Sequence, residues 1–427
     1  MSANILVMGG AGFIGSHLVD ALVTQGHRVR VFDNLEPQVH GGLREQGKWP
    51  DYCNPDAEYI LGDVRDRDAL RKAMQGVDVI FHEAAAVGVG QSMYEIEHYV
   101  DANTRGTAVL LDILANEASI RSRVRKLIVA SSMSIYGEGK YKCPVHGVVY
   151  PKLRPNDQLA ARDWEMRCPM TKSQIPNPNP QSFGCAQDRP AILRLRSGQV
   201  CNLPLKPLPT DEDKPLYPTS IYAITKKDQE EMCLAVGRAY GIPTVALRYF
   251  NVYGPRQALS NPYTGVAAIF SSRLLNGKPP VIFEDGRQSR DFVHVSDIVQ
   301  ANLLAMERDE ADYGVFNVGT GRALTILDIA NALIAHFEGT TCDSQSAIPN
   351  PKLVLSPVEA SEIVNRFRAG DIRHCFADIS RIQALGYQPR VRFEDGVAEL
   401  VDWVRTQTAV DGFERARQEL VSRGLAV

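Results

Sequence analysis

The chain has 427 residues, of which 44% are hydrophobic and 23% are charged, and its formal net charge is -3. These values are ordinary for a soluble globular protein, and the length allows two domains. The weak charge gives no basis for a nucleic-acid partner, and no apolar run reaches the roughly 18 residues of a membrane-spanning helix. Because the sequence enters a strand without a charged and apolar leader, we expect a cytoplasmic protein with no membrane partner.

The first predicted elements are a buried strand over residues 5–8 and a helix that begins at Phe13. Glycines stand at G-x-x-G-x-x-G spacing between and within them, at Gly9, Gly12 and Gly15. Glycine lets the backbone approach a pyrophosphate, and the helix N-terminus offers free N–H groups and a partial positive charge. Strand, glycine turn and helix in this order predict a dinucleotide-binding turn.

An acid ends the second predicted strand. Asp33 lies 21 residues beyond Gly12, near the interval expected for the residue that holds the adenosine ribose. Its carboxylate would accept from both ribose hydroxyls and repel a 2'-phosphate, so the sequence favours NAD over NADP. Asp63 ends a further strand and is expected near the adenine. Ala84 and Ala85 end the strand over residues 77–85, at the edge where such sheets bind ligands.

Strands and helices continue to alternate up to residue 250. Further strands are predicted at 126–132 and 244–250, and helices at about 101–118 and from Tyr222 onward. This alternation is typical of an α/β protein with a doubly wound parallel sheet, the Rossmann arrangement. We therefore expect residues 1–250 to form an NAD-binding domain.

Three polar residues that follow the dinucleotide-binding turn in the sequence form a candidate catalytic group. Ser132 ends the strand over 126–132, while Tyr222 and Lys226 stand four apart on a predicted helix and project from one face. A phenol is a poor base at neutral pH, and a nearby ammonium group lowers its pKa. Such a pair suits a general base that removes the proton of an alcohol.

Seven motifs then carry a family resemblance. They are GGAGFIG, SSMSIYG, YAITK, RYFNVYGPRQ, RQSRDFVHVSDI, FNVGTG and RAGDIRHCFADISR, in this order. Together they resemble the extended short-chain dehydrogenase/reductase family in its nucleotide-sugar epimerase/dehydratase branch, over nearly the whole chain except about 140–215. The resemblance implies a smaller α/β domain over residues 251–427, partly interleaved with the first. It also implies a homodimer.

The resemblance assigns expected roles to individual residues. Ser132, Tyr222 and Lys226 would be catalytic. The NAD site would include Tyr222 and Lys226 with Gly9, Gly12, Phe13, Ile14, Gly15, Asp33, Asn34, Asp63, Val64, Ala84, Ala85 and Asn103. The nucleotide-diphosphate sugar would contact Ser132 and Tyr222 with Ser92, Asn251, Arg290, Arg368 and Asp371. The planar forks of guanidinium groups suit its phosphates.

Two residues after Ser132 bear on the type of reaction. Dehydratases of this family carry an Asp-Glu pair directly after the catalytic Thr, whereas this chain has Met133 and Ser134. Methionine cannot protonate a leaving hydroxyl, so the sequence favours a nucleotide-sugar 4-epimerase. A 4,6-dehydratase or a simple dehydrogenase is the alternative enzyme. An NAD-sensing protein is the third possibility, but it would need none of the three catalytic residues.

A proline-rich insertion separates Ser132 from Tyr222. Residues 144–218 hold 13 of the 25 prolines, which favours a loop-rich excursion, either a tolerated surface segment or a lid. We expect the tolerated surface segment. Cysteines at 143, 168, 185 and 201 lie in or beside it, separated by 24, 16 and 15 residues. Without a close pair, we expect reduced thiols and no metal, with zinc as the alternative.

Overall fold

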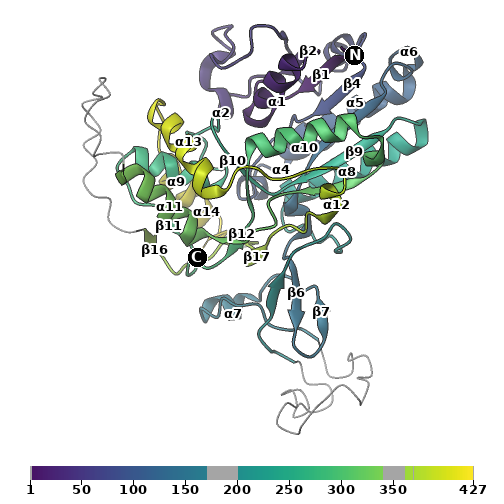
Figure 1. Cartoon of the computed structure of the whole chain (residues 1–427). Coiled ribbons are helices and arrows are strands. Elements are labelled where there is room, and N and C mark those ends of the chain that lie inside the picture. The colour runs from purple at the N-terminus through teal and green to yellow at the C-terminus, as the bar shows by residue number, and fades with distance from the viewer. Residues whose placement is uncertain (1, 171–200, 340–360, 369, 427) are drawn as a thin grey trace.

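The computed structural model describes residues 2–170, 201–339, 361–368 and 370–426 (Figure 1). Its centre is a seven-stranded parallel sheet with the strand order β14-β9-β5-β4-β1-β2-β3. The strands are β1 (Asn4–Met8), β2 (Arg28–Asp33), β3 (Glu58–Leu61), β4 (Val79–His82), β5 (Lys126–Ser132), β9 (Thr244–Tyr249) and β14 (Val315–Val318). The expected doubly wound α/β fold is confirmed.

Helices cover both faces of this sheet (Figure 1). Side chains alternate along each strand, so Val7 of β1 joins the core beneath one layer of helices and Leu6 joins the core beneath the other. The first layer contains α1 (Phe13–Thr24) and α10 (Val295–Glu307). The second layer contains α3 (Arg67–Ala73), α5 (Gly106–Asn116) and α8 (Ile221–Tyr240).

The helix expected at about 101–118 is built from three pieces. It begins earlier, as α4 (Ile96–Tyr99), continues as a π-helical stretch η3 (Val100–Arg105) and becomes α5. Within the wider π-helical turn, Asn103 is fully buried, and its side chain bonds to the backbone of Ala86. Such stretches are commonly found at functional sites, and an apolar spacing of 3.6 residues does not reveal them.

The second half of the chain forms its own core beside the sheet. Its helices are α9 (Val266–Leu275), α11 (Ile326–Gly339), α13 (Phe393–Arg405) and α14 (Phe413–Ser422). Its short strands are β10 (Asn251–Tyr253), β11 (Val281–Ile282), β12 (Ser289–Arg290), β13 (Phe292–His294), β15 (Leu324–Thr325), β16 (Glu362–Ile363) and β17 (His374–Cys375). Leu274, Leu333 and Leu400 lie in the core between these helices. Because α10 and β14 return to the central sheet, the two halves interleave.

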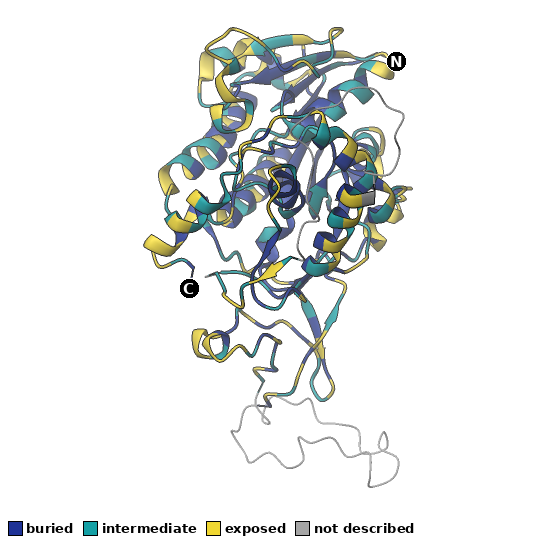
Figure 2. Ribbon diagram, turned by 90° about the vertical axis from the view of Figure 1, so that its left-hand side faces the viewer, coloured by how far each residue is buried: buried dark blue, intermediate teal, exposed yellow. Residues whose placement is uncertain are grey.

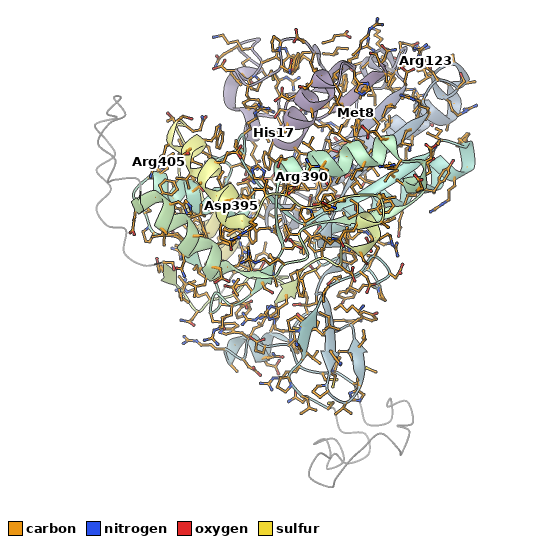
Figure 3. The ribbon with its side chains drawn as sticks, in the orientation of Figure 1. Met8, His17, Arg123, Arg390, Asp395 and Arg405 are labelled. Atoms are coloured by element: carbon orange, nitrogen blue, oxygen red, sulfur yellow. The ribbon has the colours of Figure 1, made fainter. Side chains whose placement is uncertain are left out.

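The two halves also meet at half-buried residues of α1. His17, labelled in Figure 3, lies with its Nε2 atom 3.1 Å from the carbonyl oxygen of Pro255, and Arg256 forms an ion pair of 2.7 Å with Asp20. Burial and the neighbouring Arg256 charge lower the pKa of His17 to about 4. His17 is therefore neutral at physiological pH, and its Nε2–H tautomer can donate a hydrogen bond to the carbonyl oxygen of Pro255.

A small lobe projects from the body at the lower end of Figure 1. Its antiparallel sheet has the order β7-β6-β8 and consists of β6 (Lys140–Cys143), β7 (Gly147–Val149) and β8 (Lys206–Leu208). The lobe also contains the short helix α7 (Asn156–Ala160). Its strands contain buried positions among exposed ones (Figure 2). The proline content predicted a loop-rich segment without a sheet. The alternation of apolar and polar residues over strands of three or four residues is too short to be recognised in the sequence.

The remaining elements are short. They are α2 (Pro37–His40), η1 (Gly41–Leu43), η2 (Gln91–Met93), α6 (Ala118–Arg121), η4 (Met133–Tyr136), η9 (Asp309–Ala311) and α12 (Ser380–Gln383). Among the helices in the described part of the chain, none combines the length and the apolar composition that a membrane span requires.

Candidate active site

The glycine turn between β1 and α1 forms one wall of a large cavity of about 600 Å³. Gly9 has a φ of +80°, and a Cβ atom there would lie 2.7 Å from the backbone nitrogen of Ala84. At Gly15, a Cβ atom would lie 2.2 Å from the carbonyl oxygen of Gly9. Glycine therefore permits the close approach of helix and strand that a phosphate cradle needs. The predicted residues Gly9, Gly12, Phe13, Ile14 and Gly15 all line this cavity.

Asp33 lies at the carboxyl end of β2 and also lines the cavity. Its Oδ2 atom accepts a hydrogen bond of 3.0 Å from the backbone N–H of Ala11, and Oδ1 accepts one of 2.9 Å from Leu35. A carboxylate has about four acceptor positions, so two remain for a ribose. The two backbone bonds fix the carboxylate beside the glycine turn. The neighbouring Asn34 lines the same cavity.

A smaller cavity of about 130 Å³ adjoins the first, and Asn34, Ala84 and Ala85 line both. Asp63 and Val64 line only the smaller one. The Arg65 guanidinium, 2.6 Å from Asp63, holds the pKa of that carboxyl at about 2. The structure thus places Asn34, Asp63, Val64, Ala84 and Ala85 in the walls of these two adjoining cavities. The Asp63 carboxylate forms an ion pair with Arg65.

The three predicted catalytic residues meet in the large cavity. Ser132 ends β5, while Tyr222 and Lys226 lie one turn apart on α8, and all three line the cavity. The Ser220 hydroxyl caps this helix by accepting from the N–H of Ala223 at 3.1 Å, which fixes where the first turn begins. Ser132 lowers the pKa of the Tyr222 phenol, against the effect of burial. Because both hydroxyls line one cavity, they can together bind one oxygen of a substrate.

The protonation states differ from the sequence-based expectation. Burial raises the pKa of Tyr222 to about 12, and only the neighbouring Ser132 acts in the opposite direction. The Lys226 ammonium donates to the carbonyl oxygen of Ala130 at 2.8 Å instead of to the phenol. Burial lowers the pKa of Lys226 to about 8, opposed by the negative charge of Glu83. The expected lowering of the tyrosine pKa by lysine is therefore not the dominant effect in this structure.

Glu83 is a site residue that the sequence reasoning missed. It follows β4, lines the large cavity and accepts a hydrogen bond of 2.9 Å from the hydroxyl of Tyr249. Loss of solvent raises its pKa to about 7, while Tyr249 and Lys226 favour the charged form. The available signal was an acid at the carboxyl end of a fully buried strand.

The opposite wall of the cavity comes from the second half of the chain. Asn251, Arg290, Arg368 and Asp371, the residues expected to contact the sugar nucleotide, all line it. Arg290 donates to the carbonyl oxygens of Ile372 and Arg373, at 2.7 and 3.0 Å. Its guanidinium group is thereby held against the segment that leads into β17. Arg368 forms an ion pair of 2.8 Å with Asp371.

Two predicted contact residues do not line either cavity. The Ser92 hydroxyl accepts from the N–H of Tyr222 at 3.0 Å, so it supports the first turn of α8. Asn103 accepts from the N–H of Ala86 at 2.7 Å and donates to the hydroxyl of Thr225 at 3.0 Å. Both residues position the backbone of the site, and the structure shows neither facing the cavity.

A helix close to the C-terminus completes the wall. Phe413, Ala416, Arg417 and Leu420, all on α14, line the large cavity. Glu419 on the same helix accepts hydrogen bonds from the hydroxyls of Tyr94 and Tyr263, at 2.9 and 2.5 Å. No motif in the sequence marks this segment, because apolar residues at helical spacing are equally typical of ordinary packing.

Comparisons with known proteins agree with this geometry. The model of the NAD dependent epimerase/dehydratase family matches residues 5–158 and 191–319. The chain is 32% identical over 405 residues to a dTDP-L-rhamnose 4-epimerase from Burkholderia thailandensis, with 94% of each chain covered.

Solved structures give the same result. UDP-glucose 4-epimerase from Thermotoga maritima, crystallised with UDP-glucose, is 28% identical with a TM-score of 0.64, and the match covers 94% of this chain and 99% of that one. UDP-glucose 4-epimerase from Thermus thermophilus, crystallised with NAD, is 26% identical with a TM-score of 0.64, and the match covers 95% and 100%. With its glycine turn, Asp33 and the Ser132–Tyr222 pair around one cavity, the chain belongs to the NAD-dependent epimerase/dehydratase family.

Proposed function

We propose that this protein is an NAD-dependent nucleotide-sugar 4-epimerase, which inverts a sugar at C4 by transient oxidation. The observation that carries the proposal is that Ser132, Tyr222 and Lys226 line the same cavity as the glycine turn. A base, an oxygen-binding hydroxyl and a dinucleotide cradle are the groups that reversible oxidation of an alcohol requires.

Each catalytic residue has a distinct task in this proposal. Ser132 donates a hydrogen bond to the C4 oxygen, and Tyr222 removes its proton. Lys226 would hold the nicotinamide ribose and would supply a positive charge near the tyrosine when it is protonated. NAD, when bound, would supply the hydride-transfer chemistry for both the oxidation and the reduction. Because oxidation and reduction balance within one cycle, no external reductant is consumed.

The residues after Ser132 support inversion without loss of water. Met133 is buried and Ser134 lines the cavity, so neither supplies an acid at the place where dehydratases of the family have one. Two carboxylates near the site have partners: Glu83 accepts from Tyr249, and Asp371 pairs with Arg368. A 4,6-dehydratase is the alternative, and Glu83, which follows β4, is the acid that we would assign to it.

The substrate in this proposal is a nucleoside-diphosphate sugar. Arg290 and Arg368 supply guanidinium groups on the wall opposite Tyr222, and the Oδ1 atom of Asn251 is a buried acceptor without a partner among the described residues. Likeness to the Burkholderia thailandensis protein makes dTDP-L-rhamnose our first choice of substrate. UDP-glucose is the second, from the likeness to the Thermotoga maritima structure.

The test is incubation with a panel of dTDP-, UDP- and GDP-sugars, followed by NMR of the products. We expect one member of the panel to be inverted at C4, with a deuterium label at C4 retained in the product. Stoichiometric release of NADH would instead indicate a dehydrogenase. A 4-keto-6-deoxy product would indicate a dehydratase, and washout of the label would indicate proton abstraction at carbon.

We further propose a cytoplasmic homodimer in which residues 1–250 bind NAD and residues 251–427 bind the sugar nucleotide. The six cysteines in the described part of the chain are not joined in disulfides, which is compatible with a reducing compartment. Exposed apolar side chains at Ile96, Val100 and Ile224 lie on α4, η3 and α8, which pack side by side. This surface is suited to a second copy of the chain, and the weak net charge does not suggest a nucleic-acid partner.

A further inference from the structure

A cluster of three cysteines and one histidine lies in the small lobe, away from the cavities described above. The ligand atoms of Cys143, His146, Cys168 and Cys201 all lie within 4.8 Å of one another. None of these residues lines the large or the smaller cavity. The cluster therefore needs an explanation other than the epimerase site.

The first pair of the cluster is held by a hairpin. Cys143 ends β6 and His146 directly precedes β7, so the turn between the strands brings both side chains to one side. The N–H of Val145 donates to Cys143 Sγ at 3.4 Å, and Gly147 has a φ of +69° that closes the turn. An N–H group directed at a sulfur atom stabilises negative charge on it.

The second pair is held by the backbone on either side of the undescribed residues 171–200. The N–H of Cys201 donates to the carbonyl oxygen of Met170 at 2.8 Å, and the N–H of Asn202 donates to that of Cys168 at 3.1 Å. A third bond of 2.9 Å runs from the N–H of Cys168 to the carbonyl oxygen of Leu203. Cysteines that are distant in sequence are thus neighbours in space.

The distances between the four side chains agree with a tetrahedral metal site. Around zinc, with bonds of about 2.3 Å to sulfur and 2.0–2.1 Å to nitrogen, neighbouring ligands stand about 3.5–3.8 Å apart. His146 Nδ1 lies 3.4 Å from Cys143 Sγ and 3.3 Å from Cys168 Sγ. Cys143 Sγ lies 3.9 Å from Cys201 Sγ. A disulfide would require about 2.05 Å between these sulfur atoms.

The core of the lobe is too small to be held by apolar packing alone. Its buried members are Tyr141, Cys143, Val149, Met166, Cys168, Cys201 and Leu205. Three of the seven are cysteines of the cluster. Cores of this size usually need a disulfide or a structural metal.

We propose that Cys143, His146, Cys168 and Cys201 bind one structural Zn²⁺ ion that holds the lobe together. Three thiolates and one imidazole are a common ligand set of structural zinc, and because protein atoms fill all four positions, no site is left for a substrate or water. The sequence spacing argued against zinc, because Cys143 and Cys168 are far apart in the chain and a count of cysteines does not include His146.

The zinc-bound lobe would also brace the substrate wall of the cavity. Arg154 of the lobe forms a bidentate ion pair with Glu284, at 2.7 and 2.9 Å, and both side chains are buried. Arg154 also donates to the carbonyl oxygen of Asp371 at 3.2 Å. Glu165 of the lobe forms an ion pair of 2.6 Å with Arg373. Loss of the metal should therefore affect the segment that carries Asp371.

The first experiment measures metals in the full chain, purified with no added metal and dialysed, by inductively coupled plasma mass spectrometry. We expect about one zinc per chain, the content of one such site. Replacement by Co²⁺ should give the thiolate-to-cobalt charge-transfer absorption of a tetrahedral site. Iron in place of zinc, absence of metal, or a disulfide between Cys143 and Cys201 found by mass spectrometry would overturn the proposal.

Variants identify the ligands. Cys143→Ser, Cys201→Ser and His146→Ala should lose most of the zinc, whereas Cys53→Ser, a thiol outside the lobe, should retain it. His146→Cys keeps four soft ligands and should also retain it, so the proposal stays testable if the serine variants fail to fold. Equal zinc content in His146→Ala and the unmodified chain would contradict the assignment. After zinc loss, the Kd of the sugar nucleotide should rise more than that of NAD.

Discussion

Lys226 and Ala130 are joined by a hydrogen bond of 2.8 Å between the lysine ammonium and the alanine carbonyl oxygen. This bond ties α8 to β5 two residues before Ser132, so the helix that carries Tyr222 and the strand that carries Ser132 are fixed to each other. The bond also directs the ammonium to the backbone instead of the phenol. Lys226 therefore positions Tyr222 relative to Ser132. Its charge is not the main influence on the pKa of Tyr222, which burial raises.

The first prediction concerns the catalytic pair. Tyr222→Phe should lower turnover by about 10²–10⁴-fold, because the oxygen that accepts the substrate proton is lost. NAD binding, measured by calorimetry, should remain close to that of the unmodified protein. Ser132→Ala should also lower turnover. Ser134→Ala removes a second hydroxyl that lines the same cavity, so it is the matched control and should leave turnover unchanged. Equal losses in the two serine variants would show that Ser132 has no special role.

The second prediction concerns the choice of cofactor. Asp33→Ala should weaken NAD binding by about 10- to 100-fold, since hydrogen bonds to a charged acceptor are lost. Binding of NADP should change less, because the repulsion of its 2'-phosphate is removed, so the difference in affinity narrows. Calorimetry with both dinucleotides measures this. If the unmodified protein binds NAD and NADP equally well, the assignment of Asp33 to the ribose is wrong.

The third prediction concerns the pH profile. The ammonium of Lys226, whose pKa burial lowers to about 8, is lost as pH rises through that value. Activity that needs this charge should therefore fall on the alkaline side. Because the Glu83 carboxylate raises the pKa of Lys226, Glu83→Gln should move this fall to lower pH. Glu36→Gln is the control: it changes another cavity-lining carboxylate and should leave the pH of the alkaline fall unchanged. If both variants move this pH by a similar amount, a specific Glu83–Lys226 interaction is excluded.

The fourth prediction concerns residues 171–200. Because the N–H of Cys201 bonds to the carbonyl oxygen of Met170, the two ends of this stretch are adjacent and a bridge of two glycines can join them. The shortened protein should keep its turnover, and its unfolding midpoint should stay within about 2 °C. A matched deletion that also removes Cys201 should be less stable. A joint change of KM and kcat in the shorter deletion would instead indicate a lid.

The fifth prediction concerns the oligomeric state. Val100 is 42% exposed on η3, within the proposed dimer surface. Val100→Glu should give a monomer in analytical ultracentrifugation, because a charge would be buried without a partner. Val410→Glu, at a valine that is 71% exposed elsewhere, is the control and should not change the mass. An unmodified protein that sediments as a monomer would refute the proposed dimer.

The sequence predicted the sheet well, because strand, glycine turn and helix are local patterns; the individual NAD contacts stay predictions. Ser132 and Tyr222 were also recognisable, since each lies at the end of a predicted element. Glu83 was missed, because its importance comes from Tyr249, which approaches it only in the folded chain. The direction of the Tyr222 pKa was wrong for the same reason: the bond partner of Lys226 depends on the packing of α8 against β5.

The return of β14 to the central sheet has a consequence for the synthesis of the chain. β9 ends at Tyr249, but its outer neighbour β14 begins only at Val315. While the ribosome adds the intervening residues, the hydrogen-bonding edge of β9 has no partner strand. An apolar strand edge in this condition can pair with other nascent chains. We therefore expect a chain truncated after residue 250 to aggregate or to be retained by chaperones.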